Sequence, residues 1–365
     1  MMRWWLFGSV LLAPLAVWPA PGDPMQFRNA FFIVAGLIGI LWLVPNWWLR
    51  AFCGWAVINF ALTGATWWGM AGLLGLLAWV IFYREAAHLT DRQWANLRVA
   101  VLVACAFQVG WMGLQAIGRD PLFQPVSWRG ELVPAASLQI AGWLLNPMDA
   151  ALFLGLSAPL LMALSPWYLL LVAVPILLWL KATAGLAAIA IAAGWHFRAS
   201  WKITVPVLAL VVGIWAWQFD PQGFGPKPTV WRSLGLVVAR QPVLGAGPNA
   251  LGYSVRTFQP VPIQDGTGVT ADRHETLEWN FAFNEWLQGA VEFGIVGLML
   301  AAAYVGSLIW RLRRRWTFVG ECAPALLILL ATSLGSIPLR IGPVALLAAL
   351  YLGRLEDLLT AEVPA

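Results

Sequence analysis

Long apolar runs follow one another along almost the whole chain, and they constrain its fold more than any other feature. A helix that crosses the hydrocarbon core of a bilayer needs about 20 apolar residues. Hydrophobic residues make up 61% of the chain and charged residues 11%, whereas a soluble domain carries about 25% charged residues. The sequence therefore predicts an all-α transmembrane helix bundle of about twelve spans, with residues 1–365 forming a single integral membrane domain. The runs cover residues 4–20, 31–48, 51–66, 69–83, 99–117, 138–164, 167–180, 182–197, 203–217, 286–310, 318–337 and 342–353.

Basic residues predict how these spans are oriented, because cytoplasmic loops carry an excess of lysine and arginine. The strongest such signal is the segment 311–315, with four arginines. An even number of crossings must separate it from Arg98, which requires 167–180 and 182–197 to be separate spans. Both termini are then expected in the cytoplasm, with one long extracytoplasmic loop, 218–285, between the ninth and tenth spans.

Composition also limits the partners. The net charge of +5 does not indicate a nucleic-acid partner, because the basic residues lie mainly at the ends of apolar runs, where topology explains them. The sequence contains no C-x-x-C motif, no H-E-x-x-H motif and no cluster of His and Asp. Neither a protein-held metal nor another cofactor is therefore expected. Membrane lipids are the expected surroundings.

The loop 218–285 is the one predicted segment long enough to carry chemistry outside the bilayer, and loops of this length are often functional. Its charges are segregated. Residues 221–263 contain four cations and no acid, and residues 265–278 contain four acids against Arg273. A short helix lying on the membrane surface is expected where apolar residues recur at helical spacing, namely at Val230, Trp231, Leu234, Val237 and Val238.

Three groups of motif residues lie in order between positions 142 and 297. The first is Gly142, Asn146 and Pro147; the second is Lys227 and Trp231, followed by Pro242, Gly245 and Gly247; the third is Asn284, Gln288, Glu292, Gly294 and Gly297. In order and spacing they resemble the motifs of the O-antigen ligase and O-antigen polymerase family of membrane glycosyltransferases. There are two departures. Lys227 stands where the family has an arginine, which keeps the charge but loses bidentate phosphate geometry. Phe283 stands where the family has a histidine, and it cannot accept a proton.

The resemblance implies a multi-pass protein of the bacterial inner (cytoplasmic) membrane that acts in cell-surface polysaccharide or lipopolysaccharide assembly. It implies an inverting, metal-independent glycosyltransferase. The donor would be a glycan on a polyprenyl diphosphate, and the acceptor a hydroxyl of a glycolipid, glycan or protein at the outer face of the membrane. Ligase and polymerase activity both fit. Two alternatives stay open: a non-catalytic relative that binds a glycolipid, and a transporter or flippase of a lipid-linked saccharide.

The chemistry of this transfer selects candidate residues. Negative charge develops on the leaving diphosphate, which positioned cations stabilise, and the acceptor hydroxyl must lose a proton to a base. Arg232 is the expected catalytic cation. His274 is the expected base, because it is the one histidine placed outside the membrane, and Glu278 and Glu285 are the next candidates. The residues expected to bind substrate are Lys227, Trp231, Arg240, Gly245, Gly247, Arg256, Asn284, Glu285, Glu292 and Arg340.

Several of these residues also have a purely structural interpretation. Asn284 fits the N-cap of the tenth helix. His274 lies between acidic residues and is also typical of a surface histidine, and the segment Gly245 to Gly247 is typical of a turn. Glu292 lies about two turns into a span, where a carboxylate requires a partner or a wet cavity.

Overall fold

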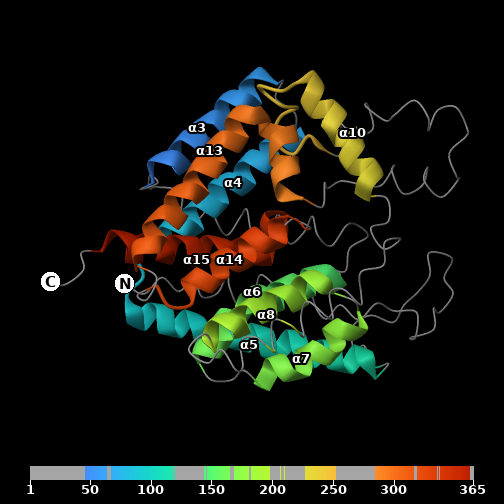
Figure 1. Cartoon of the computed structure of the whole chain (residues 1–365), viewed down its shortest axis with the longest axis vertical. Helices are drawn as coiled ribbons and strands as arrows, with labels where there is room; N and C mark the ends of the chain where they lie inside the picture. The colour runs from blue at the N-terminus through green and yellow to red at the C-terminus, as the bar shows by residue number, and fades with distance from the viewer. Residues whose placement is uncertain are drawn as a thin grey trace, which may run out of the picture.

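A computed structural model describes residues 46–63, 67–117, 146–164, 168–180, 182–197, 227–251, 284–315, 319–334 and 338–361, together with residues 119, 144, 206, 209 and 336. The regular structure of these residues is entirely helical (Figure 1), so the all-α prediction is confirmed for them. The helices are α3 (Trp47–Leu62), α4 (Trp67–Ala86), α5 (Asp91–Ala116), α6 (Pro147–Ala163), α7 (Tyr168–Trp179), α8 (Thr183–His196), α10 (Lys227–Arg240), α13 (Glu285–Arg315), α14 (Cys322–Ser333), the 3-10 helix η6 (Pro338–Arg340) and α15 (Gly342–Thr360).

Within the described ranges, three helices are long and apolar enough to cross a membrane, namely α4, α5 and α13. The helices α6, α7, α8 and α14 are apolar but shorter. The expectation of about twelve spans is therefore not supported, although a helical protein with membrane-spanning segments is. The expected span 4–20 and most of the expected spans 31–48 and 203–217 lie outside the described residues.

Helix caps explain why several helices differ in extent from the apolar runs. The Asn46 side chain accepts hydrogen bonds from the backbone N–H groups of Trp48 and Leu49 at 3.0 and 3.3 Å, so α3 begins at Trp47, inside the run expected to end at residue 48. The Asn146 side chain accepts the N–H of Met148 at 2.9 Å, and Pro147 is the first helical residue. The helix α6 therefore begins at Pro147, inside the run 138–164.

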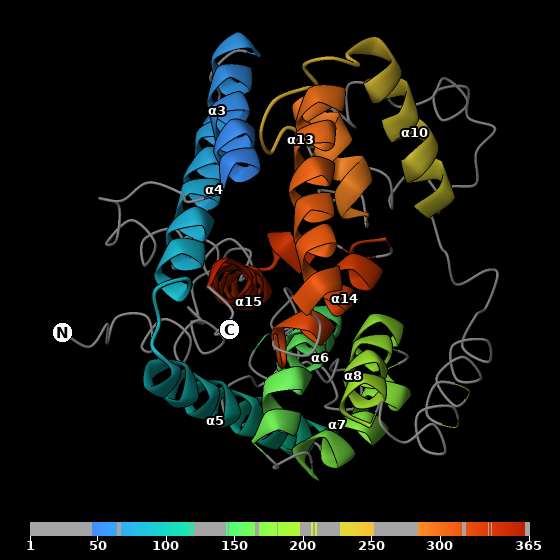
Figure 2. The same ribbon diagram turned by 60° about the vertical axis from the view of Figure 1, so that its left-hand side comes forward.

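Three layers of helices make up the described part of the molecule. Figures 1 and 2 both show α3, α4 and α13 on one side and α5, α6, α7 and α8 on the other, with α14 and α15 between them. Small residues allow close approach within the second group. A side-chain carbon added at Gly185 of α8 would lie 2.6 Å from the Cβ of Ala151 of α6. Such contacts between small residues are typical of helices packed in membranes.

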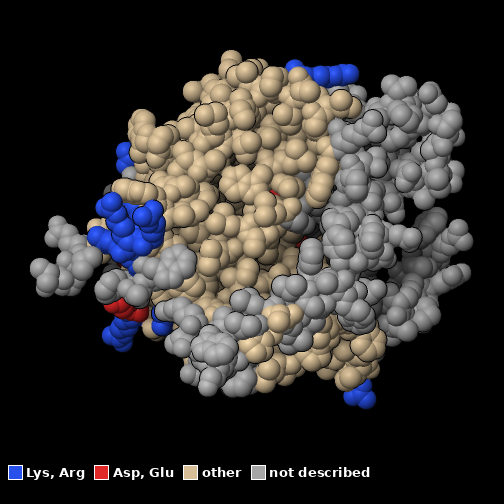
Figure 3. Space-filling view, in the orientation of Figure 1, with Lys and Arg blue, Asp and Glu red and all other residues tan. Residues whose placement is uncertain are grey.

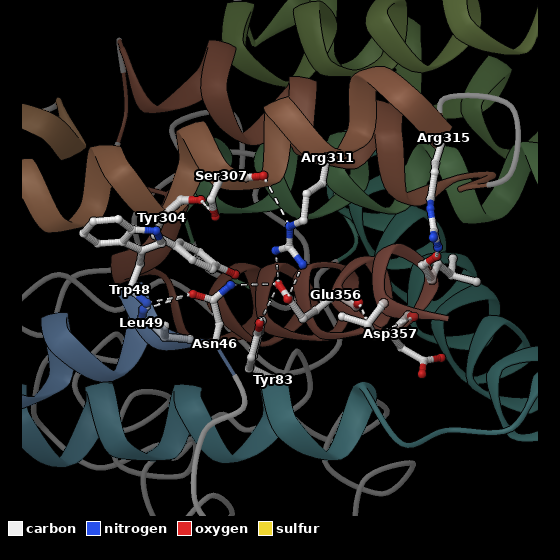
Figure 4. Close-up of polar contacts among 12 residues, drawn as sticks. Asn46, Trp48, Leu49, Tyr83, Tyr304, Ser307, Arg311, Arg315, Glu356 and Asp357 are labelled. Atoms are coloured by element: carbon white, nitrogen blue, oxygen red, sulfur yellow. Dashed lines mark hydrogen bonds and ion pairs between the residues drawn. The ribbon is translucent and has the colours of Figure 1, made fainter. Parts of the chain in front are cut away.

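Contacts between helix ends give the directions of the helices. Tyr83 of α4, Arg311 of α13 and Glu356 of α15 all lie near the ends of their helices, and they meet Asn46 at the start of α3 (Figure 4). The helices α4, α13 and α15 therefore run one way and α3 runs the other.

Basic side chains gather at the end of the bundle where α13 finishes. Arg311, Arg313, Arg314 and Arg315 lie there, and lysine and arginine atoms cluster over this end at the left of Figure 3. Broad areas of uncharged surface lie beside them. The positive-inside rule predicts this end to be cytoplasmic, so the opposite end, where α13 begins, is the one expected to face outward.

Candidate functional site

The helix α10 forms within the expected loop 218–285, where the apolar spacing predicted a helix. Its residues Leu234 and Val237 are buried against Leu251 and Val291, so the predicted stripe packs on the first part of α13. On another face of α10, Leu236 and Arg240 are exposed. Leu234 and Val237 of the stripe are therefore buried inside the protein, and they hold α10 beside the start of α13. That this helix lies on the membrane surface stays a prediction.

The helix α13 is interrupted at Gly294, whose backbone (φ 65°, ψ −171°) is not helical. An interruption frees carbonyl groups that would otherwise bond within the helix. Three of them are bound by neighbouring segments. The Val291 carbonyl accepts the Ala246 N–H at 2.7 Å, the Glu292 carbonyl accepts the Gly247 N–H at 3.0 Å, and the Phe293 carbonyl accepts the indole N–H of Trp55 at 2.8 Å.

A further hydrogen bond runs in the opposite direction, from α13 to the loop. The N–H of Ile295, beyond the break, donates to the Pro242 carbonyl at 2.8 Å. The Asn59 side chain also donates to the Leu244 carbonyl. Residues 242–247 and 291–295 thus bind each other through backbone groups, and we call them together the loop–helix junction. The second and third motif groups of the sequence meet in this junction.

Glycine is required at three positions of the junction. Gly245 (φ 73°), Gly247 (φ 103°) and Gly294 all have left-handed backbones, which residues with a Cβ adopt at a cost. A Cβ at Gly245 would lie 2.6 Å from the Val291 carbonyl oxygen, and one at Gly247 would lie 2.6 Å from the Thr63 hydroxyl. The turn interpretation of Gly245 to Gly247 is confirmed, and the turn serves to seat the broken helix.

Beside the junction lies a buried group of polar residues, Glu285, Gln288, Glu292 and Arg340, which we call the Arg340 cluster. The Arg340 Nη2 lies 2.7 Å from Glu292 Oε2, and its Nε lies 3.2 Å from Glu285 Oε1. The Gln288 amide donates to Glu292 Oε1 at 3.0 Å. The side chain of Glu292 is fully buried, so the expectation that this carboxylate has an internal partner is confirmed.

Arg340 was expected to join the cations that face a diphosphate, but its contacts favour a different role. Burial opposes the charge on the guanidinium, yet the carboxylates of Glu292 and Glu285 outweigh it and raise the pKa of Arg340. With both carboxylates ionised, two negative charges face one positive charge, which leaves the cluster with an excess negative charge. Such a group suits proton transfer better than anion binding.

The start of α13 is fixed by Asn284. Its Oδ1 accepts the N–H of Leu287 at 2.9 Å, and its Nδ2 donates to the Leu334 carbonyl at 3.0 Å. The indole N–H of Trp286 donates to the Ser333 hydroxyl at 2.9 Å. The capping interpretation of Asn284 is confirmed, and a role in substrate binding stays a prediction.

The predicted cations and base are placed only in part. The backbones of Lys227, Trp231, Arg232 and Arg240 belong to α10, and Trp231 is half-buried. The side chains of Lys227 and Arg232 lie outside the described part of the structure, as do Arg256 and His274 altogether. The structure therefore brings α10, the junction, the start of α13 and Arg340 to one end of the bundle, but it does not place His274, the predicted base.

Two contacts of the junction, made by the side chains of Trp55 and Asn59, were not predicted from the sequence. Both residues lie on α3, and both bind carbonyl groups of segments far away in the chain. A side chain that bonds to a distant backbone carbonyl leaves no local pattern, so neither spacing nor composition gives a signal for it.

Among the residues that the structure describes, no group of three or more His, Cys, Asp and Glu residues is placed to hold a metal ion. Comparison with protein-family models and with curated proteins finds no match for this chain.

Proposed function

We propose that this protein transfers a glycan from a polyprenyl-diphosphate-linked donor to an acceptor hydroxyl at the outer face of a bacterial inner membrane, as an O-antigen ligase-like or polymerase-like enzyme. The observation that carries the proposal is the loop–helix junction. The resemblance depends chiefly on two groups of motif residues separated by the segment 252–283, and these groups bind each other in the fold. A catalytic origin of both motifs explains why they meet at one place.

The proposed chemistry needs cations near the start of α13. The helix α10 supplies them in sequence, since it carries Lys227 and Arg232 in a stretch without acids, and it packs beside Val291. Cations held there would stabilise the charge that develops on the leaving diphosphate. Arg256 belongs to the same acid-free stretch.

A transporter is the competing proposal that the break in α13 raises, because transporters often place ions at unwound carbonyl groups in the membrane. Here the carbonyl groups of Val291, Glu292 and Phe293 are already bound by Ala246, Gly247 and Trp55. Each of them already accepts a hydrogen bond from a protein donor, so these carbonyl groups are less available to an ion than the unpaired ones of a transporter site. This favours the enzyme over the transporter.

The single experiment that tests the function compares cells with and without the protein. The lipid-linked glycan donor should accumulate in the membrane when the protein is absent, and purified protein should transfer glycan from that donor in vitro. Donor accumulation without transfer in vitro would favour the non-catalytic relative that Phe283 suggests. If the donor does not accumulate and no transfer is seen in vitro, both the enzyme and the non-catalytic relative are contradicted.

Topology gives the first prediction. A reporter fused after residue 315 should report a cytoplasmic position, and one fused within 245–275 an extracytoplasmic position, because four arginines lie in the last turns of α13. A pair of fluorescent and phosphatase fusions measures this directly. Both reporters on the same side of the membrane would contradict the proposed orientation.

The second prediction concerns Arg232. Replacing Arg232 with Glu should lower the transfer rate by about 10²–10³-fold, the effect of losing one preorganised electrostatic contact to the developing charge. The amount of folded protein in the membrane should not change. The matched control is Arg119→Glu, which reverses an exposed arginine just beyond the end of α5. Equal transfer rates for the two variants would exclude Arg232 from the reaction.

A further inference from the structure

The two carboxylates of the Arg340 cluster differ in how they contact the guanidinium. Glu292 and Glu285 share the single guanidinium of Arg340. Glu292 is fully buried, and it has the shorter ion pair, at 2.7 Å, as well as a hydrogen bond from Gln288. Glu292 is therefore the closer partner of Arg340, and Glu285 is the carboxylate that the guanidinium contacts less closely.

Glu285 is also the more accessible of the two. Its side chain is 13% exposed, whereas that of Glu292 is 0% exposed. It is the first residue of α13, at the end of the helix opposite the arginine segment 311–315, and a carboxylate is favoured at a helix N-terminus. In the sequence it follows Phe283, where the resemblance leads one to expect a histidine, by two residues.

The carboxylate of Glu285 is held in a fixed orientation. Its Oε1 accepts from Arg340 Nε at 3.2 Å, and its Oε2 accepts the Leu339 N–H at 3.2 Å. A carboxylate oxygen has two lone-pair directions, so these two hydrogen bonds leave a further direction on each oxygen. A base whose orientation is fixed by a neighbouring group is the arrangement that general-base catalysis requires.

We propose that Glu285 is the general base of the transfer reaction, that Arg340 positions it, and that Glu292 anchors Arg340. This inference rests on the proposed function and assigns the proton acceptor that Phe283 cannot be. In the described part of the structure, Arg340 and Glu292 are the charged groups that lie close enough to Glu285 to influence its charge.

The acceptor hydroxyl oxygen attacks the anomeric carbon of the donor sugar from the side opposite the diphosphate. A bond forms between this oxygen and that carbon, the bond from the carbon to the diphosphate oxygen breaks, and the bonding electron pair leaves with the diphosphate. The hydroxyl proton passes to Glu285, whose carboxylate becomes neutral and later returns the proton to water at the outer face.

The test measures transfer of a radiolabelled disaccharide from a synthetic polyprenyl diphosphate. The full-length protein is used in membranes of the cells that naturally make it, with the native copy removed, so that these membranes supply the acceptor. Glu285→Gln should lower the transfer rate by about 10²-fold or more. The wild-type rate should fall at acidic pH as the carboxylate is protonated, and this fall should be missing from the residual rate of the variant.

The matched control is Glu321→Gln. Glu321 forms an ion pair with Arg98, and its side chain is 11% exposed, so it resembles Glu285 in burial and pairing but lies at the start of α14, beside α5. Its substitution should leave the transfer rate unchanged. If Glu285→Gln fails to fold, Glu285→Asp keeps a carboxylate on a shorter side chain, and it should slow the transfer while the fall at acidic pH stays.

A rescue variant separates a base from a structural residue. Adding Phe283→His to Glu285→Gln should recover part of the lost rate, which a purely structural role of Glu285 would not permit. If the wild type transfers and Glu285→Gln transfers equally well, or if only His274→Ala lowers the rate, the assignment of the base is wrong while the proposed function stands. If the wild type itself transfers nothing, the proposed function is wrong and the base is wrong with it.

Discussion

Replacing Arg311 with alanine is expected to lower the free energy of unfolding by about 3–5 kcal/mol, the usual effect of removing one partner of a buried ion pair. The guanidinium of Arg311 donates to both oxygens of Glu356, at 2.6 and 2.7 Å (Figure 4). The Glu356 side chain is only 6% exposed. Without Arg311, its charge would keep, among the described residues, the neutral donors Tyr83 and Asn46, each at 3.2 Å.

The four residues of this group come from four different parts of the fold, which is why the effect should reach the whole bundle. Asn46 caps α3, Tyr83 belongs to α4, Arg311 to α13 and Glu356 to α15. Loss of the pair should therefore loosen the packing of α15 against α4 and α13. Thermal unfolding of the purified protein in detergent measures this effect.

The matched control for Arg311 is Arg313→Ala, in the same turn of α13, because Arg313 is exposed. That substitution should change the free energy of unfolding by less than about 0.5 kcal/mol, the usual range for surface positions. The double variant Arg311→Ala, Glu356→Leu should be more stable than Arg311→Ala alone, because it no longer buries an unpaired charge. Equal stability of Arg311→Ala and Arg313→Ala would contradict a stabilising role of the pair.

Features of the fold that depend on local chemistry could be predicted from the sequence. Asn284 was predicted as a helix start because an N-cap is decided within three or four residues. The helix α10 was predicted from apolar spacing alone. The need of Glu292 for a partner was also predicted, since the cost of an isolated carboxylate in a membrane does not depend on the fold.

Features that depend on the approach of distant segments could not be predicted. Arg340 was assigned to the cations around a diphosphate because the sequence cannot show that η6 lies against the first turns of α13. The number of spans also depends on caps such as Asn46, which shift a helix relative to its apolar run. The glycines of the 242–247 segment were recognised as a turn, but that they meet Gly294 follows only from the folded chain.

Replacing Gly294 with alanine should disrupt the loop–helix junction. The backbone of Gly294 (φ 65°, ψ −171°) lies in a region that is nearly exclusive to glycine, and adopting such a conformation costs other residues about 1–3 kcal/mol. A Cβ there would also collide with the backbone carbonyl of Val243. The substitution would also break two hydrogen bonds of the junction, those donated by Ala246 and Ile295. Each contributes about 1 kcal/mol to the free energy of unfolding.

The expected result is a protein that stays in the membrane but no longer binds the 242–247 segment to α13. Limited proteolysis in liposomes should then cut this segment, which is resistant in the wild type, and the proposed transfer should be lost with it. Gly289→Ala is the matched control. Gly289 lies in the first part of the same helix and has open space where its Cβ would lie, so this variant should keep the junction and gain up to about 1 kcal/mol of stability.

Gly245→Ala tests the same junction from the loop side. Its Cβ would lie 2.6 Å from the backbone nitrogen of Gly294 and from the Val291 carbonyl oxygen, so it should expose the same segment to protease. Because both substitutions break the same contact, the double variant should be cut by protease little faster than either single variant. Effects that add fully, or a Gly294→Ala protein as resistant as Gly289→Ala, would show that the interruption of α13 does not depend on the loop.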